Sequence, residues 1–187
     1  MTATNSTMLP LHTPCPDFEL LEPLSGKTLP VQDFSDQPLL LVAFICNHCP
    51  FVRHMLEAFV QLARYYQTKG VAVIAISSND AETYPDDAPP RMAQLAQELS
   101  FTFPYLYDET QEVARRFNAV CTPEFYLFDQ DRRLCYRGCF DQSTPKNALP
   151  VTGSELQAAM DAFLQGKPVP EEAQIPSIGC NIKWRPN

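Results

Sequence analysis

The chain has 187 residues, of which 45% are hydrophobic and 19% are charged, and its formal net charge at pH 7 is -8. These values are typical of one soluble globular domain, and the absence of any basic run argues against nucleic acid or an anionic membrane surface as a partner. We predict a single domain over residues 1–187, with a flexible N-terminus over residues 1–13 and a C-terminal tail over residues 166–187 that packs on the domain.

The N-terminus and the cysteine content indicate the cellular compartment. Residues 1–14 lack the basic start and apolar core of a secretory signal, and the longest apolar run is too short to span a bilayer. We therefore expect a cytoplasmic protein, in which most thiols are kept reduced. The seven cysteines are odd in number and unevenly spaced. This favours catalytic or incidental thiols over a structural disulfide framework.

The predicted elements alternate between strands and helices. Turn residues and short apolar segments indicate an N-terminal hairpin over residues 14–36. Apolar runs predict strands over residues 39–45, 71–77, 124–129 and 134–138, with an extended segment over 103–107. Helices are predicted over residues 49–68, 91–99, 108–117 and 154–165, and an acidic, proline-containing surface loop over 79–90. Asp108 and Ser154 are the expected caps of the last two helices.

These elements define an α/β fold. The long helix between the first two strands implies that they pair in parallel, with a right-handed crossover. The last two strands are joined by a short charged turn and must therefore run antiparallel. We predict a mixed central sheet flanked by helices, preceded by the N-terminal hairpin extension.

A Cys-x-x-Cys sequence, Cys46-Asn47-His48-Cys49, lies where the first buried strand ends and the long helix begins. Unpaired N–H groups and the positive end of the helix dipole favour a thiolate at this place. We expect Cys46 to be exposed and to attack, and Cys49, inside the helix, to resolve the mixed disulfide. A protonated His48 would stabilise the thiolate and make the pair more oxidising.

Two other interpretations of the cysteine pair are half of a zinc site and a pair of inert core cysteines. Zinc needs four ligands, and the other close pair, Cys135 and Cys139, has a different spacing. We therefore predict redox chemistry without a metal or an organic cofactor.

A second group of residues, Cys121-Thr122-Pro123, comes immediately before a predicted strand. Together with the strand, the Cys-x-x-Cys, the long helix and the final hairpin, it resembles the thioredoxin fold. More closely, the chain resembles peroxiredoxin-like proteins, related to the AhpC/TSA redoxins, that carry a Cys-Asn-His-Cys-Pro motif. The matching stretches are residues 46–54, 77–84, 104–112, 121–129, 136–141 and 176–184.

The resemblance implies roles for residues outside the cysteine pair. Pro123 would be cis and lie against the redox pair, and Thr122 would present its backbone to a substrate that contains a cysteine. Cys121 and Cys180 are candidate additional redox thiols, and for each the alternative is a small buried residue that only packs. Electrons would come from a thioredoxin-type or glutathione-type donor.

The sequence also departs from both of these families. The strand before Cys46 carries no buried acid, so proton transfer would use water, His48 or another group such as Glu124. Neither Cys46 nor Cys49 has the upstream Thr or Ser that helps peroxiredoxins to hold peroxide. We predict a thiol–disulfide oxidoreductase that acts on protein or small-molecule disulfides. The alternatives are a thiol-dependent peroxidase with an antioxidant role, and a non-enzymatic redox-sensing or metal-binding module.

Overall fold

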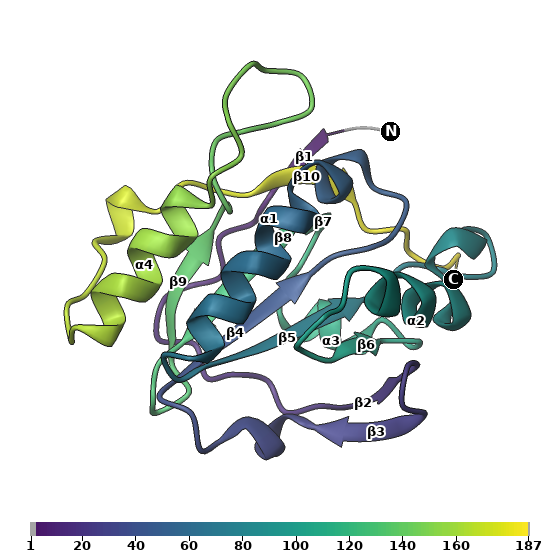
Figure 1. Cartoon of the computed structure of the whole chain (residues 1–187), viewed down its shortest axis with the longest axis horizontal. Helices are drawn as coiled ribbons and strands as arrows, with labels where there is room; N and C mark the ends of the chain where they lie inside the picture. Colours follow the sequence, from purple (N-terminus) through teal and green to yellow (C-terminus); the bar gives the residue numbers. More distant parts are fainter. Residues whose placement is uncertain (1–2, 187) are drawn as a thin grey trace.

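The computed structural model describes residues 3–186. In this part of the chain a seven-stranded mixed sheet has the order β3-β2-β6-β5-β4-β8-β9 (Figure 1). The central strands β4 (Leu39–Phe44) and β5 (Val71–Ser77) pair in parallel, as predicted. β8 (Glu124–Phe128) and β9 (Leu134–Gly138) pair antiparallel, also as predicted, and β8 lies against β4.

The N-terminal hairpin and the helices agree with the predicted order. The hairpin consists of β2 (Glu19–Glu22) and β3 (Lys27–Pro30), and it joins the sheet through β6 (Tyr105–Tyr107). The α-helices are α1 (Pro50–Gln67), α2 (Pro89–Glu98), α3 (Glu112–Arg116) and α4 (Ser154–Leu164). Short 3-10 helices cover Val31–Phe34, Pro85–Asp87 and Glu171–Ala173. Within residues 3–186, no helix is both long enough and apolar enough to span a membrane.

Strand β4 is apolar throughout because the sheet is covered on both faces. Leu41 and Ala43 point into one core cluster, together with Phe59 of α1. Leu40 and Val42 point into the other cluster, whose aromatic members include Phe117. α1 and α4 lie in front of the sheet in Figure 1, and their buried residues belong to the first cluster. This packing fixes the end of β4 and the start of α1 relative to each other.

Two predicted helix caps are wrong. α3 begins at Glu112 rather than at Asp108, because Gln111 adopts a left-handed backbone with φ 63°. The Asp108 carboxylate still accepts a hydrogen bond from the Ala114 N–H, at 2.9 Å. Ser154 is the first helical residue of α4, and the cap position belongs to Gly153, with φ 68°.

The two ends of the described chain form a second, smaller sheet. β1 (Ala3–Asn5) pairs with β10 (Ile178–Asn181), and β10 pairs with β7 (Cys121–Thr122). The sequence predicts a flexible start over residues 1–13, and within that range the backbone of residues 3–5 pairs with β10. Residues 1 and 2 lie outside the described residues. Figure 1 shows β1, β10 and β7 close to the start of α1. The tail therefore reaches the predicted redox site.

Candidate redox site

The cysteine pair lies at the predicted junction between β4 and α1. Cys49 is the N-cap residue of α1, and Pro50 occupies the first helical position, where its missing N–H is no loss. The first-turn N–H groups of a helix have no partner within the helix, and no side-chain hydrogen bond caps them here, so they favour negative charge on the nearby Cys49 sulfur. Both cysteines are buried, Cys46 with 1% and Cys49 with 0% of its surface exposed. The expected exposure of Cys46 is therefore wrong.

Thr122 contacts both sulfurs. Its hydroxyl Oγ1 lies 3.4 Å from Cys46 Sγ, and its carbonyl oxygen lies 3.2 Å from Cys49 Sγ. The peptide bond between Thr122 and Pro123 is cis, as the resemblance implied. The hollow beside Pro123, which Phe51 also lines, has a volume of about 20 Å³. This is room for about one water molecule, so the described conformation offers no open cleft here.

The two thiols hold their protons with different strength. A hydrogen bond from the Cys46 thiol is the largest influence on the Cys49 pKa, and it outweighs burial and lowers that pKa below its ordinary value. The Cys180 thiol is a further donor to the Cys49 sulfur. Burial raises the pKa of Cys46 well above its ordinary value, and the negative charge of Asp87 adds to this effect.

The Thr122 carbonyl acts in the opposite direction on Cys49. A carbonyl oxygen only accepts hydrogen bonds, so its position 3.2 Å from Cys49 Sγ favours the protonated thiol. Against this single acceptor stand the neighbouring thiols of Cys46 and Cys180, both of which lower the Cys49 pKa. The carboxylate near Cys46 also repels a thiolate there. These directions favour a thiolate on Cys49 over one on Cys46, whereas the sequence predicted the attacking thiolate at Cys46.

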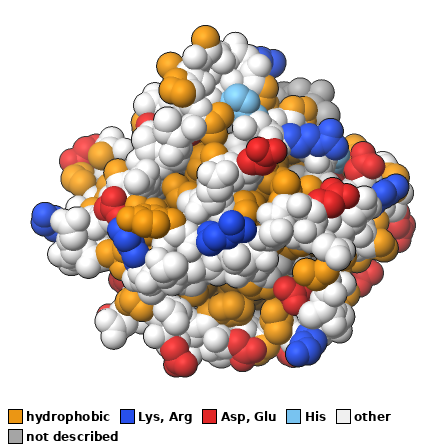
Figure 2. Space-filling view, viewed as in Figure 1, with side chains coloured by type: hydrophobic (Ala, Val, Ile, Leu, Met, Phe, Trp, Pro, Cys, Tyr) orange, Lys and Arg blue, Asp and Glu red, His pale blue; other side chains and the backbone are white. Residues whose placement is uncertain are grey.

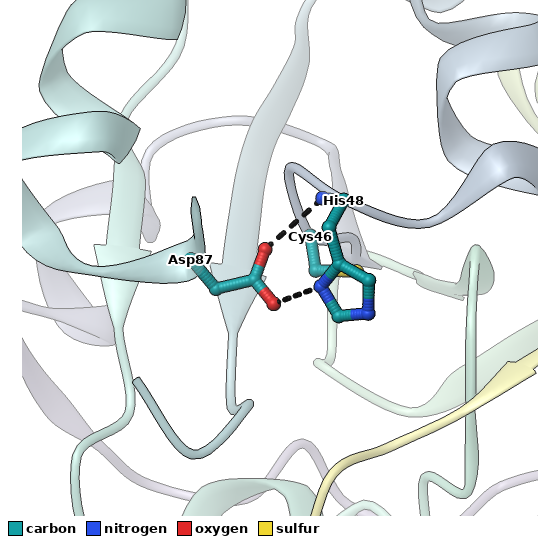
Figure 3. Close-up of side chains that lie close together, drawn as sticks. All are labelled: Cys46, His48 and Asp87. Atoms are coloured by element: carbon teal, nitrogen blue, oxygen red, sulfur yellow. Dashed lines mark hydrogen bonds and ion pairs between the residues drawn. The ribbon is translucent and has the colours of Figure 1, made fainter. Parts of the chain in front are cut away.

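Asp87 holds the turn between the two cysteines (Figure 3). Its Oδ1 accepts hydrogen bonds from the N–H groups of Asn47, at 2.7 Å, and His48, at 3.1 Å. Its Oδ2 accepts from the His48 ring at Nδ1, at 2.5 Å, and from the Asn79 side chain, at 2.8 Å. Burial alone would raise the pKa of Asp87, but the hydrogen bonds from His48 and Asn79 outweigh it and hold the pKa below its ordinary value.

His48 is oriented toward Asp87 and not toward the sulfurs. Its ring stacks on Tyr84, with centroids 5.2 Å apart and planes at 10°. Within residues 3–186 neither sulfur has a hydrogen bond to His48, and the buried Nε2 has no partner. The predicted stabilisation of a thiolate by a protonated His48 is thus opposed by the Asp87 carboxylate, which would neutralise the imidazolium.

Asp87 is the residue of this site that sequence reasoning missed. Residues 79–90 were expected to form a surface loop, which is wrong for Asn79, Asp80 and Asp87, since all three are buried. The neighbouring Asp86 is exposed, and no periodicity separates the two acids. The burial of Asp87 depends on donors from distant parts of the chain, and these are visible only in the fold.

Cys46, His48 and Asp87 could also be considered as metal ligands. One ligand atom from each lies within 4.8 Å of the others. However, both Asp87 oxygens and the His48 Nδ1 already take part in hydrogen bonds. Three ligands also fall short of the four of a structural zinc site. The arrangement fits an oriented imidazole better than a metal centre.

The two candidate additional thiols lie in different surroundings. Cys121 is buried, and its Sγ lies 3.6 Å from the Glu124 carboxylate, whose charge together with burial raises the Cys121 pKa far above its ordinary value. Glu124 also accepts hydrogen bonds from the Ser6 hydroxyl and the Val120 N–H. Its carboxylate is therefore occupied by these partners rather than by Cys49. Cys180, by contrast, lies opposite Thr122, whose carbonyl oxygen is 3.2 Å from Cys49 Sγ.

The fold and the cysteine pair define a thioredoxin-like redox protein, with a mixed sheet flanked by helices. The sequence pattern of the AhpC/TSA family matches residues 11–137, and the chain belongs to that family. None of the curated proteins matches the chain.

Three solved structures illustrate the similarity. An uncharacterized conserved protein from Geobacillus kaustophilus is 51% identical, with a TM-score of 0.97 over 100% of this chain and 98% of that chain. A hypothetical protein from Sinorhizobium meliloti is 45% identical, with a TM-score of 0.95 over 98% and 100%. The thioredoxin domain of a thiol-disulfide oxidoreductase from Bacteroides vulgatus is 13% identical, with a TM-score of 0.60 over 81% and 99%, and this likeness concerns the fold alone.

Proposed function

We propose that the chain is a thiol–disulfide oxidoreductase in which Cys46 and Cys49 form the redox pair. The observation that carries this proposal is the position of both sulfurs against Thr122 at the start of α1, with Cys46 Sγ 3.4 Å from its hydroxyl and Cys49 Sγ 3.2 Å from its carbonyl oxygen. The thiolate is the nucleophile in disulfide exchange. A second thiol in contact with it is what the reaction needs to complete the exchange.

Cys49 is the attacking residue in this proposal. Its thiolate attacks one sulfur of a substrate disulfide, so that a mixed disulfide forms and the other substrate sulfur leaves as a thiolate. Cys46 then gives up its proton and attacks Cys49 Sγ, which releases the second substrate thiolate. The protein ends with a Cys46–Cys49 disulfide, and the substrate has gained two electrons, with one proton from Cys46 and a second from solvent.

His48 and Asp87 act as positioning residues. Asp87 fixes the backbone of Asn47 and His48 through two N–H groups, and this sets the turn that carries both sulfurs. Because Asp87 also binds Nδ1, the His48 ring is held in one orientation beside Cys46.

Thr122 and Pro123 form the proposed docking edge for protein or small-molecule disulfides. The contact of Thr122 with both sulfurs supports this role. The oxidised pair would be reduced again by a thioredoxin-type or glutathione-type donor. Figure 2 shows acidic and basic side chains interspersed on one face of the molecule, with hydrophobic side chains between them. This surface does not select a strongly charged partner.

Peroxide is the second candidate substrate. The hydroxyl that the sequence lacks upstream of the cysteines is available from Thr122, whose Oγ1 lies 3.4 Å from Cys46 Sγ. A thiolate that reacts with peroxide becomes a sulfenic acid, which a neighbouring thiol converts to a disulfide. Fast, saturable consumption of hydrogen peroxide by the reduced protein would favour this function over disulfide exchange.

Turnover of a disulfide substrate tests the proposed function. Insulin reduction driven by dithiothreitol should fall by a factor of about 10³ or more in Cys49→Ser, because the nucleophile is lost. Cys135→Ser is the matched control, since Cys135 bonds the Leu127 carbonyl and not the redox pair. Full activity of Cys49→Ser would refute the proposal. Zinc or copper that copurifies in stoichiometric amount and is lost in the same variant would favour the metal-binding module.

A further inference from the structure

Strand β10 of the tail covers the proposed docking edge. It pairs antiparallel with β7, with Cys180 opposite Thr122 and Asn181 opposite Cys121. The approach is close at Gly179, where an added Cβ would lie 2.0 Å from the Thr122 carbonyl oxygen. Only a glycine fits there. The chain's own tail therefore occupies the backbone edge that a substrate would need.

The tail also brings a third sulfur to the start of α1. Cys180 is 3% exposed, belongs to the same core cluster as Cys49, and lies opposite Thr122, whose carbonyl oxygen is 3.2 Å from Cys49 Sγ. The first-turn N–H groups of α1, which have no side-chain cap, favour negative charge on both of these sulfurs. Cys49 therefore has a thiol neighbour on the tail as well as Cys46.

The charges around Cys49 differ on its two sides. Cys46 lies near the Asp87 carboxylate, which opposes its ionisation. Cys180 lies near the Lys183 ammonium, which favours ionisation. Burial raises the pKa of Cys180 to about 12, and the hydrogen bond and negative charge of Cys49 add to this. A neutral Cys49, bound in a mixed disulfide, no longer exerts the effect of its charge, whereas Lys183 still does.

We propose that Cys180 is a third redox thiol, which attacks Cys49 in competition with Cys46 and forms a Cys49–Cys180 disulfide. This inference rests on the proposed function. The Cys49 thiolate first attacks glutathione disulfide, which gives a Cys49–glutathione bond and one glutathione thiolate. Cys180 then attacks Cys49 Sγ and its proton passes to the departing second glutathione. The two protein thiols are oxidised by two electrons, and one glutathione disulfide becomes two molecules of glutathione.

The Cys49–Cys180 disulfide links the tail covalently to the start of α1. While it exists, β10 stays on β7 and the docking edge is closed to protein substrates. Attack of Cys46 on Cys49 breaks this bond, forms the Cys46–Cys49 disulfide and frees Cys180. The three thiols can therefore form either of two disulfides, and Cys49 takes part in both.

Peptide mapping of Cys46→Ser tests the proposal. After excess glutathione disulfide and acid quenching, the variant should contain linked Cys49 and Cys180 peptides, with little glutathione on Cys49. Cys46→Ser/Cys180→Ser should retain about tenfold more glutathione on Cys49, because no neighbouring thiol is left to resolve it. Cys46→Ser/Cys135→Ser is the matched control and should behave like Cys46→Ser.

Two results would overturn the proposal and can be told apart. Equal glutathione on Cys49 with and without Cys180 would exclude the third thiol and leave the proposed function standing. No glutathione and no disulfide on Cys49 in any variant would exclude the proposed function, and the inference with it. If the serine variants fail to fold, Cys46→Ala supplies the same test: linked Cys49 and Cys180 peptides support the proposal, and glutathione retained on Cys49 without such a link overturns it.

Discussion

The two sides of Cys49 are built in different ways. On one side, which we call the acidic flank, Asp87 and Asn79 hold the Cys46–His48 turn by hydrogen bonds to a buried carboxylate. On the other, the tail flank, β10 covers Thr122 through strand pairing and brings a thiol and a lysine. The acidic flank is therefore suited to fixing geometry, whereas the tail flank is suited to opening and to exchanging disulfides.

The flanks are joined at Asn79. Its side-chain nitrogen donates to Asp87, and its side-chain oxygen accepts from the Lys183 N–H at 2.8 Å. The Asp80 N–H in turn donates to the Lys183 carbonyl, at 2.8 Å. A change in one flank should therefore reach the other through Asn79 and Asp80.

The largest expected effect is on the pH dependence of Cys49 alkylation. Because the pKa of Cys49 is lowered, its thiolate should persist between pH 9 and pH 7, while Cys15, whose pKa burial raises to about 12, loses about tenfold in thiolate per pH unit. The rate of Cys49 labelling divided by that of Cys15 should therefore rise by about 100-fold as the pH falls from 9 to 7. Iodoacetamide labelling with peptide mapping measures it, and a constant ratio would contradict the assignment.

Asp87→Asn should break the acidic flank. Loss of the charged acceptor leaves buried N–H groups poorly paired, so the free energy of unfolding should fall by about 1–3 kcal/mol at pH 7. Because the folded pKa of Asp87 lies below its ordinary value of 3.8, this difference should persist at neutral pH and shrink as the pH falls below that value. Urea unfolding at several pH values measures it.

The matched control for that change is Asp86→Asn, because Asp86 is the exposed neighbour. This variant should unfold within about 0.5 kcal/mol of the wild type. An equal effect of both substitutions would mean that net charge, and not the buried carboxylate, stabilises the turn.

Gly179→Ala should open the tail flank. The added Cβ would meet the Thr122 carbonyl, so β10 must move away from β7. A loss of about 1.4 kcal/mol in the closed state would raise the rate of Cys49 labelling by a bulky thiol reagent about tenfold. Ile178→Ala, on the same strand but with an exposed side chain, is the control. Unchanged labelling in Gly179→Ala would show that β10 does not limit access.

The smallest expected effect comes from Arg115→Ala. The Arg115 guanidinium lies 4.6 Å from the ring centroid of Trp184, which is the single tryptophan of the chain. Loss of this contact should weaken the attachment of the tail by about 0.5–1 kcal/mol. The change should be visible in Trp184 fluorescence and absent in Arg116→Ala, whose side chain bonds Asp17 and Glu112 instead.

The sequence predicted the parts of the site that depend on local patterns. The end of an apolar run and the start of an amphipathic helix place Cys46 and Cys49, and the resemblance placed Thr122 and Pro123 beside them. The exposed position expected for Cys46 was wrong, because that expectation considered the helix start without Thr122, which lies against the Cys46 sulfur. β10 has four residues, one of them a glycine, and such a segment carries no alternation that predicts pairing.

Asp87 illustrates the other limit of sequence reasoning. Prolines and acids over residues 79–90 are typical of a solvated loop, and the exposure that this composition predicts is observed for Asp86. Burial of Asp87 is favourable only because backbone N–H groups from the Cys46–His48 turn converge on it. These donors come from 39 or 40 residues earlier in the chain. No local window of the sequence contains both partners.

The position of the first mixed disulfide tests the central claim most directly. Reduced wild-type protein would be mixed with glutathione disulfide, quenched with acid within milliseconds and fragmented to distinguish Cys46 from Cys49. We predict that glutathione is found first on Cys49 and that disulfides within the protein follow. Glutathione found first on Cys46 would contradict the assignment of the thiolate and restore the roles expected from the sequence.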